Sequence, residues 1–291
     1  MRALRPGPLA ALALAYLTLV SGVMIWRGIS VSPDYLLLLL VPVAIASGRL
    51  GRFLGDWVPF VAIFLGWEAM RGIAPRTGIP PIVAPLADAD RWLGGGQLPT
   101  SLLQHAFLRF GEVADDVATV VYFCHFVVPI AAGTVLWLVD RRLFLRFVTA
   151  LMGLAFACFV LYLLAPTAPP WYAQDHSVAC CFRHVIGTTL PSAVSPYYQS
   201  LNPNPVAALP SLHAAFPMLG LLALRTVDRR LTWPALAWCL MVWTSVVYLG
   251  EHYVVDVLAG VAAAVVAWEV VRRVVAPRVG ALREARAGAG G

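Results

Sequence analysis

The sequence predicts an all-α fold, a polytopic bundle of about eight transmembrane helices. Composition is the first reason. The 291 residues are 60% hydrophobic and only 12% charged, with a mean hydropathy of +0.78, whereas soluble domains are about 45–50% apolar and about 25% charged. A soluble globule of this composition would expose a largely apolar surface. The sequence therefore excludes that class, together with disordered and collagen-like chains.

Apolar runs are the second reason, because a helix needs about 20 apolar residues to cross a bilayer. The first run is too long for a simple signal peptide and has no clear small-residue cleavage site. The second is short and contains Pro42. The eight predicted spans lie near residues 8–26, 33–48, 53–73, 115–139, 143–165, 211–228, 232–250 and 253–275.

The segments between the spans carry the prolines and glycines. We expect residues 74–112 to form a loop with short interfacial helices, since they include Pro-Pro and Gly-Gly-Gly. Residues 166–210 contain eight prolines and cannot form one helix. The chain then divides into an N-terminal helix pair (1–52), a larger membrane domain (53–275) and a flexible cytoplasmic tail (276–291).

Arginine distribution predicts the orientation. All 21 basic residues are Arg, so their abundance is no sign of nucleic-acid binding. With eight spans the termini share one side, and that side holds 15 Arg against 6 on the other. Because positive residues favour the cytoplasm, we expect cytoplasmic termini and extracytoplasmic proline-rich loops in the plasma membrane. The six Arg on the other side are Arg27, Arg71, Arg76, Arg91, Arg109 and Arg183.

Ionisable residues at the start of two spans mark a candidate site, because such groups are costly in a membrane helix. His213 opens the sixth span, and His252 and Asp256 open the eighth. Two crossings separate the histidines, so both return to the extracytoplasmic face. His252 and Asp256 are four residues apart and therefore share one helix face.

Two histidines and a carboxylate suit phosphoryl transfer through a phosphohistidine. Asp256 would accept from one ring nitrogen of His252, leaving the other nitrogen free as a nucleophile or base. One imidazole would attack phosphorus, the other would protonate the leaving oxygen, and Asp256 would orient the attacking ring. The five cysteines lack metal-ligand spacing, and this scheme requires neither a metal nor a cofactor.

Three motifs carry a family resemblance. Pro210-Ser211-Leu212-His213 and His252-x-x-x-Asp256 resemble the second and third signatures of the type 2 phosphatidic acid phosphatase superfamily. Together with Ala165-Pro166-Thr167-Ala168-Pro169-Pro170-Trp171, they resemble its inositolphosphotransferase branch, which includes inositol phosphorylceramide synthases. The resemblance covers roughly residues 80–275.

The resemblance implies a fold and a set of roles. It implies a six-helix catalytic core within residues 53–275, to which the first two spans are an addition. His252 would be the nucleophile, His213 the general acid and Asp256 the orienting carboxylate.

Departures from the phosphatase pattern concern the phosphate-binding cations. Val246 stands where phosphatases carry an Arg six residues before the nucleophile, and the first motif, which begins with Lys, is absent. This favours transfer of a phosphodiester over hydrolysis of a monoester. Arg183 is the first candidate phosphate ligand, because its planar fork grips phosphate bidentately; Arg91 and Arg109 are weaker candidates. Alternatively, Arg183 is a solvated loop residue.

Other candidates have two interpretations each. Ser211 either binds substrate or only caps the sixth span. Trp171 either contacts a lipid headgroup or packs at the membrane surface. His125 either lines the site or hydrogen-bonds to a neighbouring helix. Glu68 and Arg71 indicate a helix ion pair rather than a catalytic acid, and Asp115 suits a helix N-terminus.

The sequence thus predicts an integral membrane enzyme that cleaves or transfers a lipid-linked phosphoester at the extracytoplasmic face. The substrate would be a membrane phospholipid or polyprenyl phosphate, with a lipid or polyol as a possible acceptor. The alternative enzyme is a lipid phosphate or polyprenyl diphosphate phosphatase. A transporter or inactive scaffold is the alternative from another class, although the repeated broken helices of transporters are not evident. The oligomeric state stays open.

Overall fold

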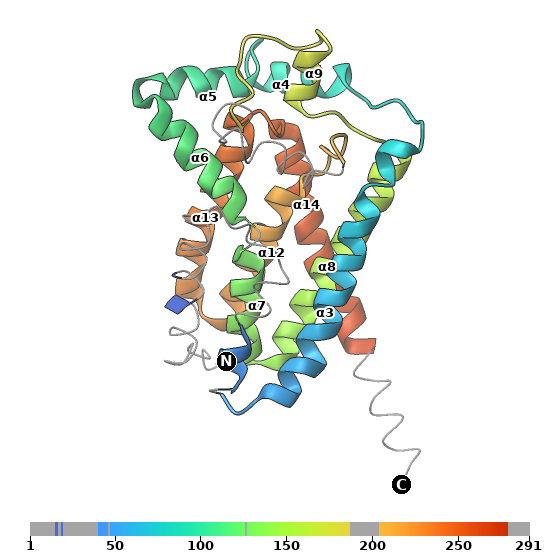
Figure 1. Ribbon diagram of the computed structural model, residues 1–291, viewed down its shortest axis with the longest axis vertical. Helices are drawn as coiled ribbons and strands as arrows, with labels where there is room; N and C mark the ends of the chain where they lie inside the picture. Colours follow the sequence, from blue (N-terminus) through green and yellow to red (C-terminus); the bar gives the residue numbers. More distant parts are fainter. Residues whose placement is uncertain are drawn as a thin grey trace.

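A computed structural model of the chain (Figure 1) is helical throughout its regular secondary structure. Extended pairing among the described residues is limited to two isolated bridges, so the predicted all-α class is confirmed. The predicted spans near 8–26 and 33–48, and the tail from 276, lie largely outside the described part of the chain. The structure describes residues 40–45, 47–125, 127–186 and 204–278, together with Ala15, Tyr16 and Leu19.

Within the part of the chain that the structure describes, four helices are long and apolar enough to cross a membrane. They lie where spans were predicted near 53–73, 143–165, 232–250 and 253–275. A fifth helix, α12 (Leu212–Val227), is apolar but only 16 residues long. The four long helices are α3 (Leu50–Arg71), α8 (Arg141–Leu164), α13 (Thr232–Tyr248), extended at its start by a 3₁₀ turn from Arg229, and α14 (Val254–Val270), which continues through a π-helical turn.

The span expected at 115–139 is two helices rather than one. α6 (Glu112–Cys124) and α7 (Val127–Val139) meet at an angle of 45°. The cause is Pro129, which lacks an N–H and whose ring would clash with the carbonyl of His125, four residues earlier. The break therefore lies at His125, in the middle of the predicted run.

Helix α12 lies at the centre of the bundle and packs against α7, α8, α13 and α14 (Figure 1). Its first turn approaches α14 very closely at Gly260. A Cβ at this position would stand 2.2 Å from the carbonyl oxygen of Ser211. Glycine thus allows the start of α12 to touch α14, and this contact sets the spacing of the two motifs.

Helix α3 packs along α8. The rings of Trp57 and Phe144 lie 5.0 Å apart, and Trp67 Nε1 donates to the carbonyl of Ala155 at 3.0 Å. Near the start of α3, beside Trp57, the buried carboxylate of Asp56 pairs with the guanidinium of Arg141. The two helices are therefore fixed to each other at both ends.

One end of the bundle is covered by short helices and is called the capped end here (Figure 1). The short helices predicted within 74–112 are present, as α4 (Ala84–Leu93) and α5 (Pro99–Phe107). α9 (Pro170–Asp175) lies beside them. Thr167 pairs with Ile82 on one side and Ala207 on the other, so it joins both proline-rich segments just before α12.

Candidate active site

The first turn of α12 carries His213. Ser211 precedes the helix, and its Oγ accepts from the backbone N–H of Ala214 at 3.3 Å. Because the Ser211 side chain is fully buried, the structure gives it the capping role. The cap fixes where the helix begins, and hence where His213 projects.

His252 lies in the tight turn between α13 and α14. Gly250 adopts a φ of +81°, a conformation that glycine adopts without strain. The N–H groups of Glu251 and His252 both donate to the carbonyl of Val246. This turn points His252 Nε2 at His213 Nδ1, and the two nitrogens lie 2.9 Å apart.

Asp256 lies on the opposite side of the His252 ring from His213. Its Oδ2 is 3.5 Å from His252 Nδ1, slightly longer than a hydrogen bond, and it accepts from the N–H of Tyr253 at 2.9 Å. His252 Nδ1 and Asp256 Oδ1 are buried and have no hydrogen-bond partner among the described residues. Catalytic contacts of this kind often tighten once substrate is bound.

The break between α6 and α7 brings two aromatic residues against His213. The ring of His125 lies 4.2 Å from that of His213, centroid to centroid, and Tyr122 stacks on His213 at 4.7 Å. His125 is buried, and its Nδ1 contacts the carbonyl of Tyr122. The structure thus brings His125 against His213, and a part for His125 in the site stays a prediction.

Trp171, at the start of α9, lies at the edge of the same turn. Its backbone N–H donates to the carbonyl of Gly250 at 3.1 Å. The ring stacks on His184 at 5.2 Å, and His184 Nε2 lies 2.8 Å from the buried carboxylate of Glu251. The half-buried Trp171 is therefore linked to the residue directly before His252.

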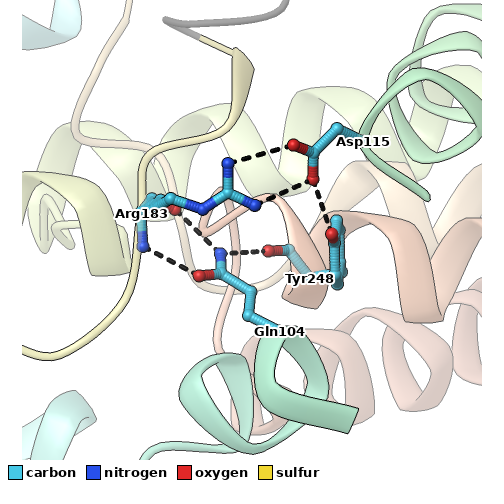
Figure 2. A network of polar contacts seen from close by, with 4 residues as sticks. All are labelled: Gln104, Asp115, Arg183 and Tyr248. Atoms are coloured by element: carbon cyan, nitrogen blue, oxygen red, sulfur yellow. Dashed lines mark hydrogen bonds and ion pairs between the residues drawn. The ribbon is translucent and has the colours of Figure 1, made fainter. Parts of the chain in front are cut away.

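Arg183 is engaged by Asp115 rather than by the histidines (Figure 2). Both terminal nitrogens donate to that carboxylate, at 3.0 and 3.1 Å, which raises the pKa of the guanidinium. Tyr248 donates to the same carboxylate at 2.5 Å. Gln104 donates to the carbonyls of Arg183 and Tyr248 and accepts from the Arg183 N–H.

This network attaches the loop around Arg183 to α5, α6 and α13. Asp115 was expected only to suit a helix N-terminus, and Gln104 was not predicted, since neither residue carries a local signal of its partners. The two weaker candidates for a phosphate ligand, Arg91 and Arg109, also contact other groups. Arg91 donates to Asp88 at 2.7 Å and to the carbonyl of Val178, and the exposed Arg109 lies over the ring of Phe110.

Asp90 of α4 is a second carboxylate at the start of α14. Its Oδ1 accepts from the N–H of Val255 at 3.1 Å, and its side chain is fully buried. Burial, together with the nearby charge of Asp256, raises the pKa of Asp90 to about 6. Sequence analysis missed Asp90 because it lies 165 residues before its partner.

An apolar helical bundle with a His–His–Asp group at one end defines a class of protein, the membrane-embedded enzymes that transfer or hydrolyse lipid phosphoesters. A family model described as PAP2 superfamily matches residues 84–270, more than half of the chain. The chain belongs to this superfamily. The matched region contains His213, His252 and Asp256 but not α3.

The chain is also similar in sequence to a curated protein. Phosphoinositol dihydroceramide synthase of Bacteroides thetaiotaomicron is 29% identical over 233 residues, which are 72% of this chain and 74% of the relative. No solved structure matches the chain significantly. The chain is therefore a multi-pass membrane enzyme of the lipid phosphotransferase and phosphatase type, with similarity to an inositolphosphotransferase.

Proposed function

We propose that this enzyme transfers a phosphorylated headgroup from a lipid phosphodiester to an acceptor hydroxyl, through a phosphohistidine on His252. The observation that carries the proposal is the alignment of three groups. His252 presents Nε2 to His213 at 2.9 Å and Nδ1 to Asp256 at 3.5 Å. One histidine thus has a carboxylate behind it and a second histidine in front, which suits a nucleophile and a general acid.

In the first half-reaction, Asp256 accepts from Nδ1–H of His252 and leaves the Nε2 lone pair free. Nε2 attacks phosphorus, and the bond from phosphorus to the leaving lipid oxygen breaks as His213 donates a proton to that oxygen. In the second, His213 takes the proton of the acceptor hydroxyl, whose oxygen attacks phosphorus and releases His252. The substrate phosphate would enter between the two facing nitrogens.

The headgroup and acceptor follow from similarity and charge. The relative's name couples phosphoinositol with dihydroceramide, and we propose a phosphoinositol donor and a ceramide-type acceptor here. Val246 in place of Arg, and the lack of Lys, fit a phosphodiester of lower charge than a monoester. Trp171 would contact the headgroup, and His125 would hold the His213 ring by packing against it.

We also propose that the reaction occurs at the extracytoplasmic face of the cell membrane. The catalytic residues lie at the capped end, among the loops that hold few of the 21 Arg. Positive residues favour the cytoplasmic side, which supports placing the opposite end of the bundle there. The domain unit would be residues 53–275.

The test uses purified protein in lipid vesicles with a radiolabelled phosphoinositol lipid, with and without ceramide. We expect labelled product only with the acceptor, and an acid-labile, base-stable label on the protein. His252→Ala should abolish both, whereas His105→Ala, an exposed histidine of α5, should leave both unchanged. Labelling that survives His252→Ala would overturn the mechanism. Acceptor-independent phosphate release would favour the phosphatase alternative.

A further inference from the structure

The proposed transfer needs a cation for the phosphodiester, because an unpaired anion in a poorly solvated site is costly. The usual positions do not supply it, since Val246 replaces one Arg and Lys is absent. Arg183 has both terminal nitrogens committed to Asp115. A phosphate ligand would need to be another arginine near the capped end, one that keeps donors free.

Arg71, the last residue of α3, meets the first requirement. Its ion pair with Glu68 was expected from the sequence and is present at 2.9 Å. Both contacts to Glu68 come from the same nitrogen, Nη1. Nη2 and Nε make no hydrogen bond to the described residues, so part of the guanidinium fork is available to a ligand.

The position of Arg71 is fixed by aromatic packing that leads to the histidines. Its guanidinium lies 5.5 Å from the ring centroid of Trp67, and the Trp67 ring packs edge-on against Phe216 at 6.4 Å. Phe216 is three residues after His213 and thus on the same face of α12. The Arg71 side chain is only 19% exposed, and its charge interacts electrostatically with His213 and His125.

A small hollow lined by apolar residues, with room for about one water molecule, lies deeper along the same helices. Helix α3 contributes Phe60 and Phe64, and α7 contributes Ile130. Phe216, one turn below His213, forms another part of the wall. Phe64 lies seven residues before Arg71, which is about 10 Å along a helix. The apolar walls lead away from the cation, which is the direction in which the chain of a bound lipid would run.

We propose that Arg71 is the phosphate ligand of this active site and that the substrate's lipid chain lies along α3 toward the hollow. This inference rests on the proposed phosphotransfer. It assigns a substrate-binding role to a helix outside the region that the family model matches. Nη2 and Nε would donate to the non-bridging oxygens of the phosphodiester while Glu68 holds Nη1.

The test is binding of orthovanadate, a phosphate transition-state mimic, to the purified full-length protein in detergent. Arg71→Gln should weaken binding by about tenfold or more, the effect of losing charged hydrogen bonds. Arg71→Lys keeps the charge without the fork and should weaken it less. Arg109→Gln, an exposed arginine at the same end, should bind as the wild type does.

Glu68→Gln separates phosphate binding from a structural role of the ion pair, because it breaks the pair but keeps the cation. Binding should be unchanged or tighter in Glu68→Gln. Equal weakening in Glu68→Gln and Arg71→Gln would overturn the proposal. Wild-type affinity for orthovanadate in Arg71→Gln would also overturn the proposal. The same holds if only Arg183→Gln weakens binding.

Thermal melting of each variant identifies any loss that comes from unfolding. If Arg71→Gln does not fold, Arg71→Lys decides the question, because unchanged affinity in a folded lysine variant overturns a role for the guanidinium fork. Wild-type protein that does not bind orthovanadate, or binding that survives His252→Ala together with His213→Ala, would instead overturn the proposed function. The two failures are therefore distinguishable.

Discussion

At the scale of single residues, the contact between His213 Nδ1 and His252 Nε2 determines which ring nitrogens face each other. With Asp256 behind Nδ1 of His252, the tautomer that keeps a proton on Nδ1 is favoured, and Nε2 would be the nucleophilic atom of the proposed mechanism. Asp256 also accepts from the N–H of Tyr253. In that mechanism, one carboxylate fixes both the start of α14 and the orientation of the nucleophile.

Asp256→Asn should lower kcat by about 100- to 10,000-fold, the range found when a neutral group replaces the carboxylate behind a catalytic histidine. The amide oxygen can still accept from Tyr253, so the melting temperature should change little. Turnover and melting, measured on the same preparation, check this. Wild-type kcat in the variant would contradict the role given to Asp256.

Asp90 should make stability depend on pH. Its pKa is about 6 in the folded protein and 3.8 as a reference value, so the folded state holds its proton more tightly than the unfolded state. The stabilisation of the folded state that this proton provides is fully present below about pH 4 and is lost as pH rises through about 6. The total is at most about 3 kcal/mol, at about 1.4 kcal/mol per pKa unit.

Asp90→Asn cannot ionise, and its amide oxygen can still accept from Val255. The melting temperature of the variant relative to wild type should therefore increase from pH 4 to pH 6.5 and then level off. Asp88→Asn, which changes an exposed carboxylate on the same helix, is the matched control. A difference that stays constant with pH would contradict the assignment.

At the scale of elements, helix starts and helix breaks position the site. The α6–α7 break at Pro129 brings His125 and Tyr122 against His213. The Ser211 cap sets the start of α12. The approach of α14 to α12 at Gly260 then brings the two motifs into register, and the Ser211 N–H donates to the carbonyl of Asp256 at 3.0 Å.

Gly260→Ala should separate these two helices, because its Cβ would overlap the backbone oxygen of Ser211, which cannot rotate away. We expect a loss of about 1–3 kcal/mol in stability, typical of overpacking, and a larger fractional loss of turnover as His213 moves from His252. Gly153→Ala, in α8 with open space around its Cβ, should be neutral or stabilising. Equal melting and activity in the two variants would contradict this account.

At the scale of the whole molecule, the bundle has two unlike ends. The capped end carries α4, α5 and α9 (Figure 1). Asp90 of α4 accepts from the N–H of Val255, three residues after His252, so the histidine pair lies near this end. The opposite end carries Arg141 and the arginines at the end of α14, such as Arg272. If charge distribution sets the orientation, the histidine pair faces the extracytoplasmic side.

Single cysteines at the two ends test the orientation. In a chain whose own cysteines are replaced, Asp88→Cys should react with a membrane-impermeant maleimide on intact cells. Arg272→Cys, partly exposed at the opposite end, should react only after permeabilisation. The reverse pattern would invert the predicted topology, and retained turnover of each variant would show that labelling reports the functional fold.

Sequence reasoning was strongest where the signal is local. The four-residue spacing of His252 and Asp256 predicts a shared helix face, and two membrane crossings predict that His213 returns to the same end. In the structure, His252 lies in the turn before α14 rather than on the helix, but its Nδ1 still lies 3.5 Å from Asp256 and its Nε2 faces His213. It was weakest where a residue's partner is distant, as with Asp115 and Arg183, 68 residues apart. The proline in the predicted fourth span was a local signal of the helix break and was overlooked.

The sequence by itself determined the class of molecule and the identity of the central residues. A chain of this apolar composition is expected to form membrane helices, and residue spacing predicts which motif residues lie near one another on a helix. The tertiary structure alone decided that Arg183 pairs with Asp115, that Asp90 caps α14 and that Arg71 lies over Trp67, which packs against Phe216 of α12. The order of apolar residues along the chain shows which helix faces are buried. The partner of a buried charge can lie far away in the sequence, so only the folded bundle shows which residue it is.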